Sequence, residues 1–219
     1  NVIRMASESA IESIEEDNAD EKFLTMKLTR ISDQTQRAAS IIDHMRVFGR
    51  KADEEFEVID LRETVDKSLS FMSEQLRLRE INLIRDYSDK SCFVRGHSVQ
   101  IEQVIINLLS NARDALAEWV NVDTAKAITV TIEVNTAQRV VNLSIADTGG
   151  GIKADVIDRI FEPFYTTKQI GKGTGLGLSI SYGIVTDMGG NMSAENGVLG
   201  AVIKMSFPLV EELNCGVSG

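Results

Sequence analysis

The sequence predicts an α+β protein in which an N-terminal helical hairpin precedes an α/β sandwich. Two kinds of periodicity support this prediction. In residues 21–50, apolar side chains recur at alternating spacings of four and three, which is the seam of a heptad repeat. Residues 128–134 and 141–145 alternate between apolar and polar side chains, as strands with one buried face do. Runs of such strands, with helices between them, indicate a sheet covered by helices on one side.

The predicted hairpin consists of two amphipathic helices joined by a short acidic connection. They cover residues 1–16 and 21–50. Their apolar positions are Ile3, Ala10 and Ile14, and then Leu24, Leu28, Ile31, Thr35, Ala38, Ile42 and Met45. One hairpin leaves such a stripe in water, and dimerisation into a four-helix bundle would cover it. The alternative, that the hairpin packs on the rest of its own chain, stays open.

The domain boundaries follow from a break in the heptad pattern. A charged run at residues 50–55 interrupts the seam and indicates a linker over residues 51–59. We therefore predict a hairpin domain at residues 1–50, a mixed domain at residues 60–208 and a tail at residues 209–219.

The mixed domain carries its own start and stop signals. Asp60, with Glu63 three residues later, predicts the N-cap of a helix over residues 60–80. Gly189 and Gly190 end a helix over residues 175–188, and Asn196–Gly197 predicts a hairpin turn. The other predicted elements are strands at residues 81–85 and 92–95, a helix at residues 98–119 that Trp119 anchors, and a last strand with Ala201, Ile203, Met205 and Phe207 on one face.

Composition excludes several classes of protein. The net charge of −10 repels nucleic acid, so we expect no nucleic-acid partner. Cys92 and Cys215 lie far apart without Cys/His spacing, which argues against a disulfide framework or a zinc site and favours a reducing, cytoplasmic setting. No apolar run approaches the roughly 20 residues that cross a bilayer. The chain begins at Asn1 inside a predicted helix, so we expect it to be a piece of a longer protein whose upstream part includes any sensor or membrane segment.

A polar stripe marks the long helix. Asn107, Asn111, Asp114 and Glu118 recur at i, i+4, i+7 and i+11 on an otherwise apolar helix. Amides on such a face need partners if they are buried. A solvated face is the alternative, although a surface would more often carry Glu or Lys than Asn.

Two glycine-rich segments suggest a nucleotide pocket. In DTGGGI, residues 147–152, the glycines let the backbone approach a flat ligand, and the carboxylate of Asp147 can accept a hydrogen bond from an amine such as adenine N6. Residues 171–178 form a loop that runs into a helix N-terminus, which favours phosphate. The triplet Asp-Thr-Gly also occurs in aspartic proteases. Those enzymes need two carboxylates that share a proton, and this chain holds one copy.

Four segments together resemble the boxes of sensor histidine kinases. They are QVIINLLSNARDAL (103–116), DTGGGI (147–152), FEPFYTTK (161–168) and GKGTGLGLS (171–179), which are similar to the N, first glycine, F and second glycine boxes. The resemblance spans about residues 60–208. It implies the ATP-binding sandwich shared with gyrase-type and chaperone ATPases, with ATP and Mg²⁺ as ligands. The helical hairpin resembles the dimerisation and phosphotransfer domain of the same family.

The resemblance also implies roles for individual residues. Asn111 would help to hold Mg²⁺, Asn107 would lie near the phosphates, and Asp147 would read adenine. Lys168 and Thr174 would approach the phosphates under a lid over residues 169–175. The full set of implied ATP-binding residues is Asn107, Asn111, Asp114, Asp147, Gly149, Gly151, Ile152, Phe164, Thr167, Lys168, Gly171, Gly173, Thr174, Gly175, Leu176, Gly177 and Leu178.

Two departures shape the expected reaction. Gyrase-type ATPases place a water-activating Glu where this chain has Asn107, and an amide cannot take a proton, so transfer is favoured over hydrolysis. The acceptor His of the family is not matched by His44 or His97, because neither has the family's surroundings. The opening NVIRMASESA resembles the stretch after an HExNQPL-like box, which would place the acceptor about seven residues before Asn1 on the same helix.

The sequence therefore predicts the ATP-binding core of a histidine kinase. The resemblance implies a homodimer that passes the γ-phosphoryl group of ATP to a His and then to an Asp of a response-regulator receiver domain. We expect this chain to bind ATP without phosphorylating itself. A catalytically silent docking module and a hydrolysing ATPase are the alternatives.

Overall fold

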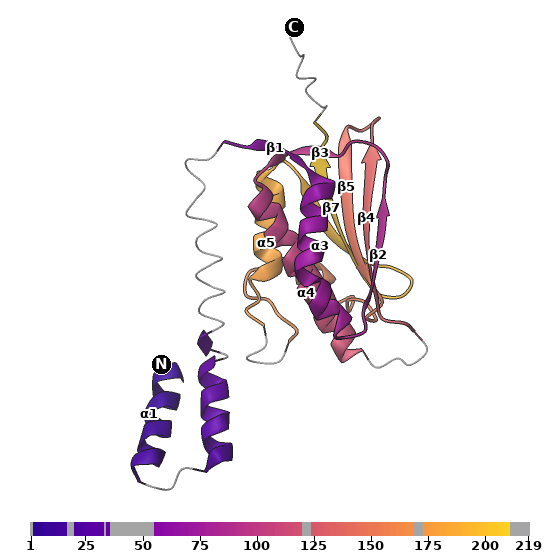
Figure 1. Ribbon diagram of the computed structural model, residues 1–219. Helices are drawn as coiled ribbons and strands as arrows, with labels where there is room; N and C mark the ends of the chain where they lie inside the picture. Colours follow the sequence, from indigo (N-terminus) through magenta and orange to yellow (C-terminus); the bar gives the residue numbers. More distant parts are fainter. Residues whose placement is uncertain are drawn as a thin grey trace. The chain divides into compact units, whose positions relative to one another are not determined.

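The computed structural model describes residues 2–16, 20–32, 34–35, 55–119, 124–168 and 173–210. The chain divides into two compact units, each of which is described by itself (Figure 1). The first comprises Asn1–Glu54 with Phe164–Leu176, and the second comprises Glu55–Pro163 with Gly177–Gly219. Within the described ranges, no helix is both long and apolar enough to span a membrane.

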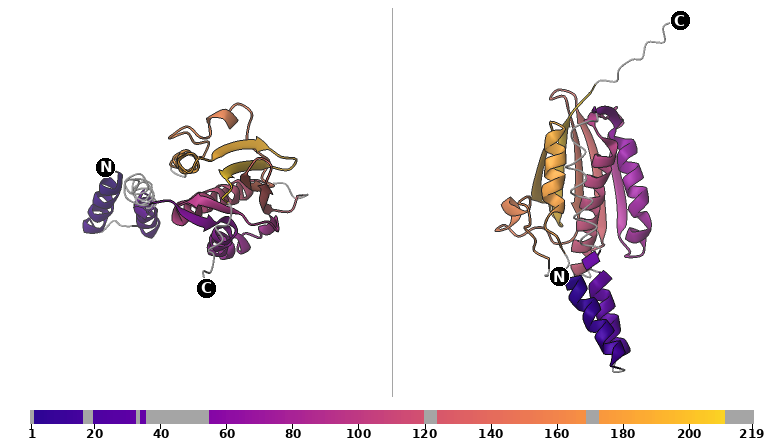
Figure 2. Two further views of the ribbon diagram at one scale, coloured as in Figure 1. Left: turned by 90° about the horizontal axis from the view of Figure 1, so that it is seen from above. Right: turned by 90° about the vertical axis from the view of Figure 1, so that its left-hand side faces the viewer.

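The first unit contains the expected helical hairpin. Helix α1, Val2–Glu15, lies beside a helix over residues 21–32 (Figures 1 and 2). Ala6 and Ala10 of α1 are buried. Phe23, Leu24 and Ile31 of the second helix are half-buried. Most of the other large apolar residues are exposed: Val2, Ile3, Met5, Ile11, Ile14, Met26 and Leu28. The predicted seam positions Ala38, Ile42 and Met45 lie outside the described residues.

The second unit is built on a five-stranded mixed sheet with the order β2-β4-β5-β7-β6. Strand β2 pairs with β4 in parallel, and the other neighbours are antiparallel. The bounds are β2 Asn82–Tyr87, β4 Ala127–Asn135, β5 Val140–Asp147, β6 Asn191–Asn196 and β7 Ala201–Pro208. A separate two-stranded sheet pairs β1, Glu57–Asp60, with β3, Phe93–Gly96.

Three helices cover one face of the large sheet. These are α3 Leu61–Arg77, α4 Ser98–Glu118 and α5 Gly177–Asp187 (Figure 2), and a short 3₁₀ turn, η1 Ile157–Arg159, follows β5. The core lies between helices and sheet, where Leu69, Leu109 and Val130 are fully buried. The alternating residues of β4 and β5 point inward as predicted, with Ile128 and Leu143 also at 0% exposure. The α+β prediction is therefore confirmed.

Several boundaries differ from the prediction. Strand β1 overlaps the end of the predicted linker. The sequence did not predict this strand because it is only four residues long and buries only Ile59, which leaves too little periodicity to recognise. Helix α4 begins at Ser98, as expected, with His97 at its N-cap, and the Ser98 amide donates to Glu57 Oε1 at 3.4 Å. The last hairpin turns through Gly197–Gly200 rather than at Asn196–Gly197, since Asn196 still pairs with Ala201 in the ladder.

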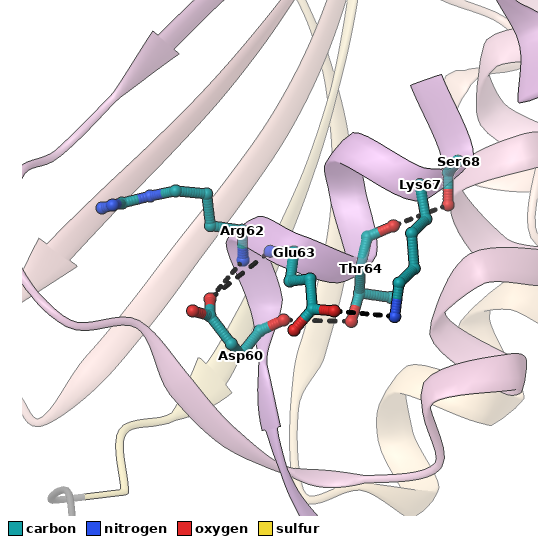
Figure 3. A network of polar contacts seen from close by, with 6 residues as sticks. All are labelled: Asp60, Arg62, Glu63, Thr64, Lys67 and Ser68. Atoms are coloured by element: carbon teal, nitrogen blue, oxygen red, sulfur yellow. Dashed lines mark hydrogen bonds and ion pairs between the residues drawn. The ribbon is translucent and has the colours of Figure 1, made fainter. Parts of the chain in front are cut away.

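The predicted cap of α3 is present in the structure (Figure 3). Asp60 Oδ1 accepts hydrogen bonds from the amides of Arg62 at 2.9 Å and Glu63 at 3.4 Å. The Asp60 carbonyl accepts the Thr64 hydroxyl at 3.0 Å. The Glu63 carboxylate pairs with Lys67 at 2.9 Å. Asp60 thus satisfies two of the amides that a helix start leaves without partners.

We expect Asp60→Ala to lower the free energy of unfolding by about 1 kcal/mol, because these two amides lose their acceptor. Asp60→Asn should retain most of the stability. The measurement is urea unfolding, with Asp89→Ala as the matched control, since Asp89 is an exposed aspartate in a nearby loop. Equal midpoints for Asp60→Ala and Asp89→Ala would show that the cap contributes nothing measurable.

Candidate functional site

The polar stripe of α4 is largely withdrawn from solvent. Asn107, Asn111 and Asp114 are half-buried, and only Glu118 is exposed. The solvated-face interpretation therefore describes Glu118 alone. The other three side chains stand on one face of a helix whose opposite face lies in the core.

Asn107 joins α4 to α5. Its Nδ2 donates to Ser181 Oγ at 2.9 Å, and Ser181 is 2% exposed. A Cβ added at Gly177, the first residue of α5, would lie 2.3 Å from Asn107 Oδ1. The amide of Asn107 is thus held between the first turn of α5 and a buried hydroxyl. This contact brings the predicted site residues Asn107 and Gly177 together.

Asp114 lies in an ion pair rather than standing free. Its Oδ1 accepts from Arg113 Nη2 at 2.8 Å and from Arg113 Nε at 3.1 Å. Arg113 also donates to Gln75 Oε1 of α3 at 2.6 Å and to Ser110 Oγ at 2.9 Å. The carboxylate of Asp114 therefore helps to fix an arginine that ties α4 to α3.

Asp147, at the end of β5, has two unequal carboxylate oxygens. Oδ1 accepts from the backbone amides of Gly149 at 2.8 Å and Ala201 at 3.3 Å. Within the described part of the chain, Oδ2 accepts no hydrogen bond and can receive a donor from a ligand. Burial raises the pKa of this carboxyl, and the amides of Gly149 and Ala201 oppose that rise.

The glycines after Asp147 form a bare loop held by the β6–β7 hairpin. Gly150 and Gly151 have φ of +83° and +82°, which L side chains rarely adopt. Asn196 fixes the end of the loop by two hydrogen bonds. Its Oδ1 accepts from the Ile152 amide and its Nδ2 donates to the Ile152 carbonyl, both at 2.7 Å. The loop therefore has a defined shape although it carries almost no side chains.

Gly200 approaches Asp147 more closely than any side chain would allow. A Cβ there would lie 2.2 Å from the Asp147 carbonyl oxygen and 2.6 Å from Oδ1. None of the sequence motifs includes Gly200, Ala201, Asn196 or Ser181. The local sequence at Asn196 is typical only of a turn, and nothing in it indicates which distant loop the hairpin will contact.

The segment Phe164–Leu176 holds seven of the predicted site residues in its described part. Phe164 is 75% exposed with φ of +66°, and a Cβ at Gly175 would lie 2.4 Å from the Phe164 carbonyl carbon, so the two ends of the segment meet. Thr174 Oγ1 accepts from the Leu176 amide at 3.4 Å. The others are Thr167, Lys168 and Gly173. Gly171 lies outside the described residues, and Leu178 follows Gly177 in the first turn of α5.

Two open hollows lie elsewhere, on the sheet face opposite the helices. They measure about 530 and 270 Å³ and are lined mainly by strand residues, including Thr131, Glu133 and Asn142 in both. None of the predicted site residues that the structure describes lines either hollow. The chemistry described above gathers instead at α4, the end of β5 and the start of α5.

Comparison with known families gives a direct match. Residues 96–211 match the family described as histidine kinase-, DNA gyrase B- and HSP90-like ATPases. The chain is 36% identical over 218 residues to the two-component sensor PprA of Pseudomonas aeruginosa, covering 99% of this chain and 23% of that protein. It is 36% identical over 194 residues to the sensor kinase CckA of Brucella abortus, covering 84% and 20%. The chain thus spans a quarter or less of these relatives.

Solved structures agree with this match. The catalytic domain of histidine kinase ThkA superposes with a TM-score of 0.62 at 31% identity, covering 71% of this chain and 98% of that one. The structure of ThkA in complex with the response regulator TrrA gives a TM-score of 0.74 at 25% identity, covering 96% and 58%.

Two glycine-to-alanine substitutions test the close approach of Gly200 to Asp147, one at Gly200 and one at the control position Gly183. We expect Gly200→Ala to lower the free energy of unfolding by about 1–3 kcal/mol, because the new methyl group would overlap the Asp147 backbone. Gly183, inside α5, has nothing within 4 Å of an added Cβ. Gly183→Ala should therefore raise stability by up to about 1 kcal/mol. Denaturant unfolding of both variants is the measurement, and a neutral Gly200→Ala would contradict the tight approach.

Proposed function

Because the chain belongs to the histidine kinase-, DNA gyrase B- and HSP90-like ATPases, and its relatives include two-component sensors and sensor kinases, we propose that it is the ATP-binding core of a sensor histidine kinase. In this proposal the core binds ATP, and the γ-phosphoryl group passes to a histidine. A response-regulator receiver domain then accepts it on an aspartate. ThkA is a histidine kinase that forms a complex with its response regulator, which supports this class of partner.

The open oxygen of Asp147 is the observation that carries the proposal. Oδ1 is occupied by two backbone amides, so the carboxylate is fixed and Oδ2 remains as an acceptor beside a glycine loop. An exocyclic amine such as adenine N6 is the donor that this arrangement suits. The bare backbone at Gly149–Gly151 leaves room for a flat base.

The phosphates are proposed to lie toward the first turn of α5. Gly177 and Leu178 are the first two residues of this helix. A helix N-terminus offers backbone amides without intrahelical partners and the positive end of the helix dipole. Lys168 and Thr174, on the segment that precedes α5, would add a cation and a hydroxyl to the phosphate chain. Phe164, Thr167, Gly171, Gly173, Gly175 and Leu176 would shape that segment around the nucleotide.

Asn111 is the residue proposed to hold Mg²⁺. It is half-buried on the same face of α4 as Asn107, and an amide oxygen is a ligand that suits this hard cation. When bound with ATP, the ion would neutralise phosphate charge. Asp114 would act mainly through Arg113, because its carboxylate is already paired.

Transfer is better supported than hydrolysis. Asn107 carries an amide, which cannot take a proton from water, and this amide is already hydrogen-bonded to Ser181.

The helical hairpin is proposed to form a homodimer, which would cover exposed residues such as Ile11, Met26 and Leu28. A kinase that consumes ATP would work in the cytoplasm.

The Asp147→Asn variant tests base recognition. Asn keeps an Oδ1 acceptor for Gly149 and Ala201 but places an amide donor where the adenine amine would approach. We expect affinity for a non-hydrolysable ATP analogue to fall on the order of a hundredfold in calorimetric titration. Asp155→Asn, which alters an exposed aspartate after the glycine loop, should bind as wild type does.

The same variant has an expected stability effect of opposite sign. Burial raises the pKa of Asp147 in the folded state, so ionisation of this carboxyl lowers the free energy of unfolding. The full stability is present below the unfolded-state pKa, and part of it is lost as the pH rises through the folded-state pKa. At neutral pH, Asp147→Asn should therefore be at least as stable as wild type. Lost binding together with lost stability would point to misfolding, and unchanged binding would reject Asp147 as the base reader.

Phosphotransfer is tested on the complete protein. Incubation with γ-labelled ATP and Mg²⁺ should label a histidine with phosphate that acid removes and base does not. His97→Gln should still be labelled, because the His97 ring packs edge-on against Phe56 at 5.0 Å, at the N-cap of α4. Asp147→Asn should abolish the label. Steady phosphate release without labelled histidine would favour a hydrolysing ATPase instead.

A further inference from the structure

We infer that Trp119 is a positioning residue of the nucleotide site, which braces the glycine loop from the end of α4. This inference rests on the proposed function, because it assigns Trp119 a role in nucleotide binding. Trp119 is the only tryptophan of the chain, and no motif of the resemblance includes it.

The contact is between the indole ring and Gly150. A Cβ added at Gly150 would lie 2.3, 2.5 and 2.7 Å from Cζ3, Cε3 and Cη2 of Trp119. The six-membered ring therefore rests against the backbone of the central glycine of the loop. With φ of +83° at Gly150, both the backbone conformation and the ring exclude any side chain there.

The backbone at the end of α4 places the ring. The Trp119 amide still donates to the Ala115 carbonyl at 3.0 Å, but its φ of −81° and ψ of 115° are extended. Ala115, four residues earlier, lies 3.2 Å from a Cβ built at Gly149. Residues four apart share a helix face, so Ala115 and Trp119 support consecutive glycines of the loop.

Further contacts of the loop come from the β6–β7 hairpin. The Gly150 amide donates to the Leu199 carbonyl at 3.3 Å, and the Asn196 amide binds Ile152 through both of its groups. Gly150 is thus contacted by the Trp119 ring and by a hairpin carbonyl. A loop of consecutive glycines has a large conformational freedom to lose, and contacts that restrict it before the ligand arrives lower the cost of binding.

A role as a simple helix anchor would be expected to bury the indole more completely. Trp119 is 39% exposed, whereas the anchoring side chain of the preceding turn, Leu116, is fully buried. The ring is therefore less buried than a core side chain, and it lies against the glycine loop. Removing it should disturb nucleotide affinity more than overall stability.

The experiment compares ring removal with a matched control. Calorimetric titration with a non-hydrolysable ATP analogue should show about tenfold weaker binding by Trp119→Ala, because the loop must be ordered on binding. Trp119→Phe, which retains an aromatic ring, should bind nearly as wild type. Phe71→Ala is the control, since Phe71 is a 68% exposed aromatic residue on α3, and it should leave affinity unchanged.

Hydrogen exchange without nucleotide gives a second readout. The amides of Gly149–Ile152 should exchange faster in Trp119→Ala, while those of α3 remain unchanged.

If Trp119→Ala fails to fold, Trp119→Leu replaces it as the ring-free variant. Equal affinity and equal loop exchange in wild type and a folded ring-free variant would overturn the inference. A folded wild type that binds no nucleotide would instead overturn the proposed function. Weakened binding that is confined to the ring-free variants would support both the proposed function and the role of Trp119.

Discussion

The arrangement of the second unit depends on one half-buried carboxylate at the end of a strand. Asp147 is fixed because two backbone amides bind the same oxygen, and one of them, that of Ala201, belongs to a strand more than fifty residues away. Burying charge is costly unless donors compensate it. The glycine loop and the first residue of β7 supply those donors. The antiparallel pairing of β5 with β7 brings Ala201 within reach of Asp147.

Helix α4 organises the surroundings of this carboxylate. Asn107 joins it to α5 through Ser181, and Arg113 joins it to α3 through Gln75. Its last turn supports the glycine loop through Ala115 and Trp119. Apolar residues such as Leu109 bury the opposite side of the same helix. The polar face is therefore placed by the packing of the apolar face, and the two cannot shift independently.

Much of this architecture could be predicted from local signals. The Asp60 cap, the alternating strands β4 and β5 and the glycine stop after α5 follow from contacts between residues near in sequence. Strand β1 could not be predicted, because four residues with a single buried side chain do not form a period. The role of Asn196 could not be predicted either, because its local sequence is that of a turn, whereas its partner Ile152 lies in the loop that follows β5.

The sequence by itself determined the fold class and the order of the boxes, and it singled out Asp147 as a candidate, since periodicity and motif spacing are properties of the chain. Only the tertiary structure decided which oxygen of Asp147 is occupied, that Asp114 is bound by Arg113, and that Gly200 and Trp119 flank the site. These facts depend on distances between elements that the pairing register and helix packing fix. A linear pattern carries no such distances, so residues that meet only after folding leave no common signal in the sequence.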